Sequence, residues 1–120
     1  MQRDLAGLAK MVQHFCEERD WDPFHNPKDL AIGIVTEAGE LLDLFRFQTA
    51  DDVAVMLRDP KAREAIGEEL ADVFFFLLRF SQMYGFDLAE ALERKLKINA
   101  EKYPVEKAKG SNRKADAARR

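Results

Sequence analysis

The sequence predicts an all-α fold, and three features of the pattern carry this prediction. Apolar residues recur at intervals of three and four along most of the chain, which is the spacing of one face of an amphipathic helix. Capping residues stand directly before a proline at Asn26-Pro27 and at Asp59-Pro60, as is typical of helix starts. No segment alternates apolar and polar residues as a half-buried strand would.

The first half of the chain is expected to form two helices joined by an ordered loop. The first helix follows an apolar stripe and ends near Arg19 or Asp20. Residues 21–27 hold two prolines, two aromatic residues and turn-forming polar residues, so they predict a structured loop rather than a linker. The second helix is expected to begin just after Asn26 and to run to about Phe45.

The second half is expected to contain two further long helices. Residues 49–57 form a connection with room for a short helix, and a long helix then covers 60–83 until Gly85 stops it. The apolar run 73–78 could also suit a strand, but its length and its flanking residues favour the middle of that helix. The fourth helix covers 88–103.

The composition fits one globular domain and excludes several classes of protein. With 120 residues, of which 47% are hydrophobic and 34% charged, the chain is too short for a two-domain enzyme. Its net charge of −3 does not attract nucleic acid or an anionic membrane, so neither is an expected partner. We expect the domain to span residues 1–108, and residues 109–120 to form a basic, disordered tail.

The expected location is the cytoplasm. The single cysteine, Cys16, lies in the apolar stripe of the first helix and has no partner for an intramolecular disulfide, which favours a reducing compartment. The first ten residues lack the apolar core of a signal peptide, and no run approaches the roughly 18 apolar residues of a membrane span.

Two pairs of acidic residues fall on or beside the apolar faces of the predicted helices. On a helical wheel Glu37 lies inside the apolar arc of the second helix, with Glu40 at its edge. Glu69 and Asp72 repeat this arrangement on the long helix. Side chains three residues apart share a face, so each pair could ligate one ion, and such oxygen ligands suit Mg²⁺, with Mn²⁺ as a substitute. A di-iron site is not expected, because neither histidine stands in a Glu-x-x-His motif.

The four acids also fit two arrangements that involve no metal. The carboxylates could pair with lysines or arginines, or they could be solvated. Lys95, Asn99 and Lys102 lie on the apolar side of the fourth helix, so that side becomes cationic towards its end. These lysines could neutralise the acids or hold the phosphates of a substrate, and both roles fit the pattern.

Several segments together resemble the MazG-like branch of the all-α nucleoside triphosphate pyrophosphohydrolases, and especially its dCTP pyrophosphatase group. They cover nearly all of residues 15–110 and are Arg19 to Leu30, Glu37 to Leu41, Glu69 to Val73, Lys95 to Asn99 and Lys102 to Pro104. The resemblance implies a four-helix bundle that hydrolyses a nucleoside triphosphate to the monophosphate and pyrophosphate. A non-catalytic helical assembly module is the alternative from another class.

The resemblance also implies roles for individual residues. Mg²⁺ is expected on Glu37, Glu40, Glu69 and Asp72, with the first two nearest to the attacking water as the catalytic pair. The expected phosphate ligands are Lys95, Asn99, Lys102 and Tyr103. The expected base pocket consists of Trp21, Phe24, His25 and Phe47.

The chain departs from the family pattern at three positions. Thr36 stands where the wider MazG pattern has a glutamate, Phe76 where the dCTP-type group often has a tyrosine, and Phe47 where that group has a tryptophan. A close aromatic ring at Phe76 could still exclude a ribose 2′-hydroxyl. The expected substrate is dCTP or a related, modified pyrimidine deoxynucleotide, in nucleotide-pool house-cleaning. Phosphoribosyl-ATP pyrophosphohydrolase and dimeric dUTPase activities are the alternatives.

The protein is also expected to self-associate. Phe74, Phe75 and Leu78 are assigned to the far side of the long helix, where they would need cover. The resemblance implies a homotetramer built as a dimer of dimers.

Overall fold

The computed structural model describes residues 3–113, and every regular element in that range is helical. The elements in chain order are α1 (Leu5–Glu18), the 3₁₀ helix η1 (Asp22–Phe24), α2 (Pro27–Phe45), α3 (Ala50–Met56), α4 (Pro60–Tyr84), α5 (Leu88–Lys102) and α6 (Val105–Ala108). This confirms the predicted all-α class. The four long helices and the short helix α3 lie where the sequence predicted them, whereas the single turn of α6 was not predicted.

The caps explain why the helices start and stop at these residues. The side chains of Asn26, Asp59 and Asp87 each accept a hydrogen bond from the backbone N–H three residues later. Thr49 caps α3 in the same way, and Asp52 completes a capping box by accepting from the Thr49 backbone. Gly85 ends α4 with φ at 75°, a left-handed conformation that glycine adopts without a steric penalty.

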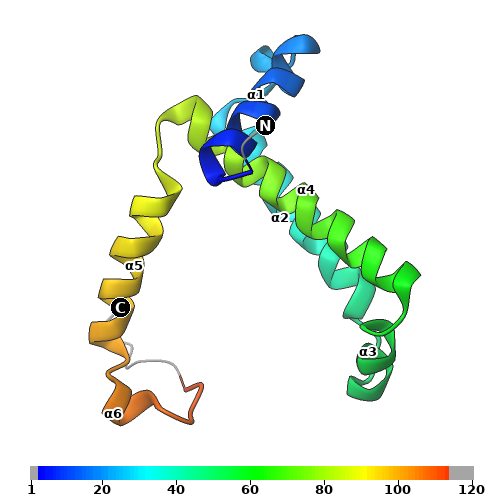
Figure 1. The fold of residues 1–120 in the computed structure, drawn as a ribbon, viewed down its shortest axis with the longest axis vertical. Coiled ribbons are helices and arrows are strands. Elements are labelled where there is room, and N and C mark those ends of the chain that lie inside the picture. Colours follow the sequence, from blue (N-terminus) through cyan, green and yellow to red (C-terminus); the bar gives the residue numbers. More distant parts are fainter. Residues whose placement is uncertain (1–2, 114–120) are drawn as a thin grey trace. The chain divides into compact units, whose positions relative to one another are not determined.

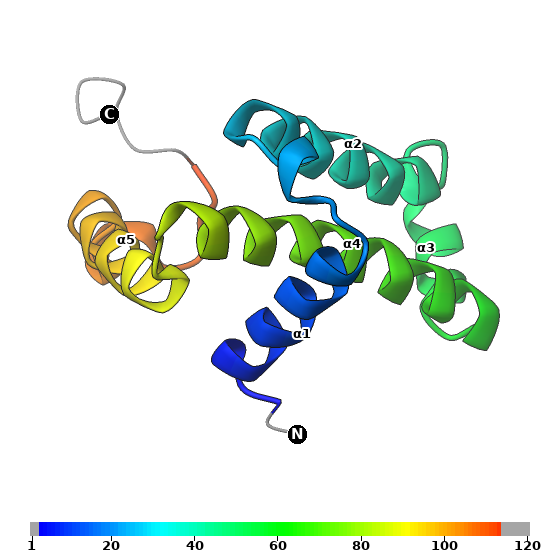
Figure 2. The ribbon, with the colours of Figure 1, turned by 90° about the horizontal axis from the view of Figure 1, so that it is seen from above.

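The chain divides into two compact units after Gly85. In the first unit α2 lies alongside α4 and runs in the opposite direction, and α3 connects their ends (Figure 1). Helix α1 packs across α4, as the view from above also shows (Figure 2). Helix α4 is therefore the element that both other long helices of this unit contact.

The hydrophobic core of the described residues is small. Cys16, Leu30 and Leu78 are its fully buried apolar side chains, one each from α1, α2 and α4. The expectation that Leu78 lies on an uncovered far side of α4 was wrong, because α1 packs against α4 and leaves Leu78 only 3% exposed. Phe75 is half-buried for the same reason, while Phe74 stays 39% exposed.

The second unit holds α5 and α6. On α5, Leu92 is 60% and Leu96 57% exposed. Of the predicted tail, residues 109–113 are exposed and not helical, and residues 114–120 lie outside the described range. None of the helices within residues 3–113 combines the length and the apolar character needed to cross a membrane.

Candidate functional site

The antiparallel pair α2 and α4 brings four carboxylates together. Glu37 and Glu40 come from α2, and Glu69 and Asp72 come from α4. One oxygen from each side chain lies within 4.8 Å of the oxygens of the other three. Because residues three apart share a helix face, each helix presents both of its acids to the other. Each of the four carboxylates therefore offers one oxygen to the same small volume between α2 and α4.

The four acids differ in burial and in hydrogen bonding. Glu37 and Glu69 are half-buried, and the Oε2 atom of each is buried without a hydrogen-bond partner. Glu40 and Asp72 are exposed. Within residues 3–85, no lysine or arginine forms an ion pair with any of the four. Buried polar atoms normally have a hydrogen-bond partner. Two carboxylate oxygens without one in a single cluster are therefore suited to bind a ligand.

The crowding of these acids changes their protonation. Desolvation raises the pKa of Glu37 to about 7, helped by a hydrogen bond with Glu40 and by the neighbouring negative charges. Desolvation also raises the pKa of Glu69, with further contributions from Glu40 and Asp72. A divalent cation would reverse both effects, because it favours the ionised carboxylates. The donor set, all carboxylate oxygen with two oxygens unsatisfied, fits a hard ion such as Mg²⁺ or Mn²⁺.

A cavity of about 450 Å³ opens beside the carboxylates. Its lining residues are Met11, Val12, Phe15, Trp21, Asp72, Phe75 and Phe76. Asp72 belongs to both the cavity and the acidic cluster, so the two features form one continuous site. The size and the mostly apolar wall are those of a small-molecule pocket with one charged end.

The aromatic rings of the wall contact one another edge to face. The ring centroids lie 5.6 Å apart for Phe15 and Trp21, 6.0 Å for Phe15 and Phe75, and 5.3 Å for Phe75 and Phe76. Such contacts favour a fixed geometry over free rotation of the rings. The cavity therefore has a rigid aromatic wall contributed by α1, the loop after α1, and α4.

Known proteins share this architecture. The MazG-like family matches residues 32–117 of the chain. The chain belongs to this family. Human dCTP pyrophosphatase 1 is 36% identical over 110 residues, or 92% of the chain, and the mouse protein is 35% identical over 107 residues, or 89%. The chain spans 65% and 63% of the length of these two relatives.

The fold of this chain also resembles that of a solved structure. The crystal structure of a pyrophosphatase from Archaeoglobus fulgidus superposes with a TM-score of 0.78 at 31% sequence identity. The match covers 87% of this chain and 95% of that one.

The structure places only part of the expected base pocket in the wall of this MazG-like cavity. Trp21 and Phe76 line it, but Phe24, His25 and Phe47 do not. Phe24 is 68% and Phe47 83% exposed. Phe15 and Phe75, which were not among the expected pocket residues, line the cavity as well. Both residues belong to the apolar stripe of their helix, and this position is the only sequence feature that could have predicted them as wall residues.

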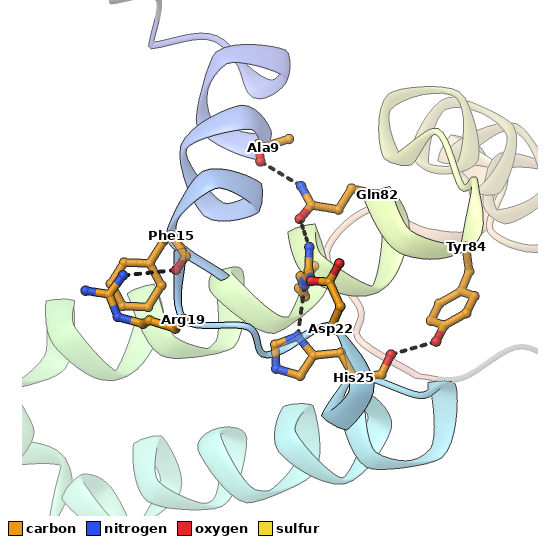
Figure 3. Close-up of polar contacts among 8 residues, drawn as sticks. Ala9, Phe15, Arg19, Asp22, His25, Gln82 and Tyr84 are labelled. Atoms are coloured by element: carbon orange, nitrogen blue, oxygen red, sulfur yellow. Dashed lines mark hydrogen bonds and ion pairs between the residues drawn. The ribbon is translucent and has the colours of Figure 1, made fainter. Parts of the chain in front are cut away.

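His25 lies behind the wall and belongs to a polar network centred on Arg79 (Figure 3). Arg79 is only 2% exposed, and its guanidinium donates to His25 Nδ1 at 2.9 Å and to Gln82 Oε1 at 2.8 Å. It also forms an ion pair with Asp22. Gln82 in turn donates to the Ala9 carbonyl at 2.6 Å. The network thus ties α1 and the loop at residues 21–25 to α4, and nothing in the sequence pattern indicated it.

The network also fixes the state of the His25 ring. Burial and the nearby charge of Arg79 lower the pKa of His25, so the ring is neutral near pH 7. Because Arg79 donates to Nδ1, the ring proton is on Nε2. The ring packs edge to face against Trp21, with 6.1 Å between centroids. His25 therefore supports a residue of the cavity wall.

The expected phosphate ligands all lie in the second unit. Lys95, Asn99 and Lys102 follow one another at intervals of four and three along α5 and so share one face, and Tyr103 is the residue that ends the helix. Lys95 is exposed, whereas Asn99 and Lys102 are half-buried.

Proposed function

We propose that the protein is a divalent-metal-dependent nucleoside triphosphate pyrophosphohydrolase that acts on dCTP or on a base-modified pyrimidine deoxynucleotide. The observation that carries this proposal is the continuity of the site: Asp72 belongs both to the carboxylate cluster and to the aromatic cavity. A nucleotide has the matching layout, with a flat base at one end and a polyphosphate at the other. The names of the curated relatives support the same substrate class.

The four carboxylates would hold Mg²⁺ or Mn²⁺ in this proposal. The ion supplies charge neutralisation for the triphosphate and a lowered pKa for a bound water. Glu37 and Glu40 are proposed as the pair nearest to the attacking water, and a carboxylate of this pair accepts the proton of that water. Glu40 hydrogen-bonds with Glu37 and completes the catalytic pair.

The reaction that follows breaks the bond between the α and β phosphates. Water supplies an oxygen to one product and its proton passes to the carboxylate, giving the nucleoside monophosphate and pyrophosphate. The base stacks against the aromatic wall, which includes Trp21 and Phe76. Lys95, Asn99, Lys102 and Tyr103 are proposed to bind the phosphates as donors to their oxygens.

Self-association belongs to the same proposal. The described chain leaves many large apolar side chains exposed, among them Val35 at 71% on α2, Leu70 at 52% on α4 and Leu92 at 60% on α5. Single exposed apolar residues are ordinary, but this number beside a three-residue core favours a homo-oligomer, with the tetramer as the proposed state. Light scattering coupled to size-exclusion chromatography measures it directly.

Pyrophosphate release from dCTP, dTTP, dATP, dGTP and 5-methyl-dCTP, with Mg²⁺, with Mn²⁺ and with a chelator, tests the activity. We expect turnover that requires metal, favours the cytosine nucleotides and falls at least about 100-fold in Asp72→Asn. The matched control is Asp43→Asn, an exposed acid of α2 outside the cluster, which should retain activity. The same assay with dUTP and with phosphoribosyl-ATP tests the two alternative substrates, and turnover of one of these alone would replace dCTP as the proposed substrate. No turnover of any nucleotide would refute the proposal.

A further inference from the structure

The ring of Phe76 rests against the backbone of α2 at Gly33. A Cβ atom added at Gly33 would lie 2.6 Å from Cε1 of the ring and 2.8 Å from both Cδ1 and Cζ. Ordinary contacts of a Cβ begin at 3.4 Å, so no residue other than glycine fits without displacing the ring. Glycine in the middle of a helix is less stable than alanine by roughly 0.5 to 1 kcal/mol. Gly33 therefore leaves room for the Phe76 ring but lowers the stability of α2.

The ring of Phe76 meets Gly33 of α2 and is also part of the cavity wall. Phe76 lines the cavity, whereas Gly33 does not. The ring also packs edge to face against Phe75, whose plane is nearly perpendicular to it at 89°. Phe76 also follows Asp72 by four residues, so it lies one helical turn beyond an acid of the metal cluster. Because the ring is part of the cavity wall, a displacement that relieves a contact at Gly33 would change the shape of the cavity beside that acid.

We propose that Gly33 is a specificity-determining residue, which sets the depth of the base cavity by letting Phe76 recess against α2. This inference rests on the proposed function, because it assigns the cavity to the base. A methyl group at position 33 needs the ring to move by at least 0.8 Å, the difference between 3.4 and 2.6 Å. The cavity then becomes shallower, and the largest bases lose the most contact.

The test compares Gly33→Ala with Gly67→Ala. Gly67 is also an interior helix glycine, but a Cβ there meets nothing within 4 Å. Trp21 is the only tryptophan and lines the cavity, so its fluorescence reports binding without turnover. The probes are the α,β-imido analogues of dCTP and 5-methyl-dCTP with Mg²⁺. We expect Gly33→Ala to weaken the methylated analogue about 10-fold more than the unmethylated one, and Gly67→Ala to leave the ratio unchanged.

A second substitution separates a packing effect from a general loss of structure. Leu is smaller than Phe, so Gly33→Ala combined with Phe76→Leu should restore the wild-type ratio of the two affinities. Phe76→Leu alone should deepen the cavity and shift the ratio towards the methylated analogue. A thermal melt would show whether Gly33→Ala folds. If it does not, Phe76→Leu still tests the step on which the role of Gly33 depends, that the Phe76 ring sets the depth of the cavity, and an unchanged ratio in this variant would refute the inference.

The outcomes distinguish this inference from the proposed function. Wild-type protein that binds neither analogue and releases no pyrophosphate refutes the proposed function. Wild-type protein that binds and turns over nucleotide, with a ratio that neither Gly33→Ala nor Phe76→Leu changes by more than about twofold, leaves the function intact and refutes the role of Gly33.

Discussion

Replacing Glu37 by glutamine should stabilise the metal-free protein at high pH. Two unit charges 4.8 Å apart repel by about 0.9 kcal/mol at the dielectric constant of water, and by about 3.5 kcal/mol at an effective value of 20. Glu40 and Asp72 are exposed, so the lower value applies, and the sum over three partners is about 1 to 3 kcal/mol. Glutamine keeps the shape of the side chain and removes the charge.

The effect should depend on pH in a defined direction. The pKa of Glu37 is raised from 4.5 to about 7, so the folded protein binds more protons than the unfolded chain between these values. The contribution of Glu37 to stability therefore falls as pH rises from 4.5 to 7 and stays low above that. At pH 5 only a small part of this stability has been lost, so Glu37→Gln should exceed wild type in stability by much less at pH 5 than at pH 9.

Urea denaturation at pH 5 and pH 9, with and without Mg²⁺ and at one protein concentration, measures the difference. We expect the stability advantage of the variant to be largest at pH 9 without metal, and Mg²⁺ to stabilise wild type more than the variant. Glu64→Gln is the control, an exposed acid of α4 outside the cluster, and it should show neither effect. A variant that is less stable than wild type at pH 9, or shifted equally at both pH values, would refute the reasoning.

Three further predictions concern the network and the core. Arg79→Met should lower the free energy of unfolding by about 3 to 5 kcal/mol, since one charged and two neutral hydrogen-bond partners are lost, and a double-mutant cycle with Asp22→Asn should be non-additive. Cys16 is fully buried and burial raises its pKa, so a thiol reagent should react only after denaturation, and reaction in the native state would contradict the burial. The lowered pKa of His25 should reduce stability as pH falls below 6.5, and His25→Gln should remove that part of the pH dependence.

Local patterns were enough to predict most of the helices and the pairing of the acids. Caps such as Asn26 and Asp59 act on the backbone three residues away, so the sequence shows both partners of the interaction. The proximity of Glu37 to Glu69 needed one more assumption, that two apolar stripes face each other, and the packing of α2 on α4 satisfies it.

Contacts between distant residues could not be predicted in the same way. Arg79 contacts His25 and Asp22 across more than 50 positions, and a single arginine in an apolar run gives no sign of its partners. Leu78 was misplaced because a helical wheel shows which residues share a face but not which helix covers that face. The contact of Phe76 with Gly33 depends on how the side chains of two helices pack. A glycine inside a helix occurs for several structural reasons, so Gly33 alone does not predict this contact.

Helix α4 carries residues of the carboxylate cluster, of the aromatic wall and of the Arg79 network within one uninterrupted run of 25 residues. Its first half supplies Glu69 and Asp72, its middle supplies Phe75 and Phe76, and its last turns supply the Arg79 network. Deleting one residue from this helix would rotate everything beyond it by about 100° relative to what precedes it. Insertions and deletions should therefore be absent from α4 during divergence of the family and should accumulate in the connections at residues 46–49 and 57–59 instead.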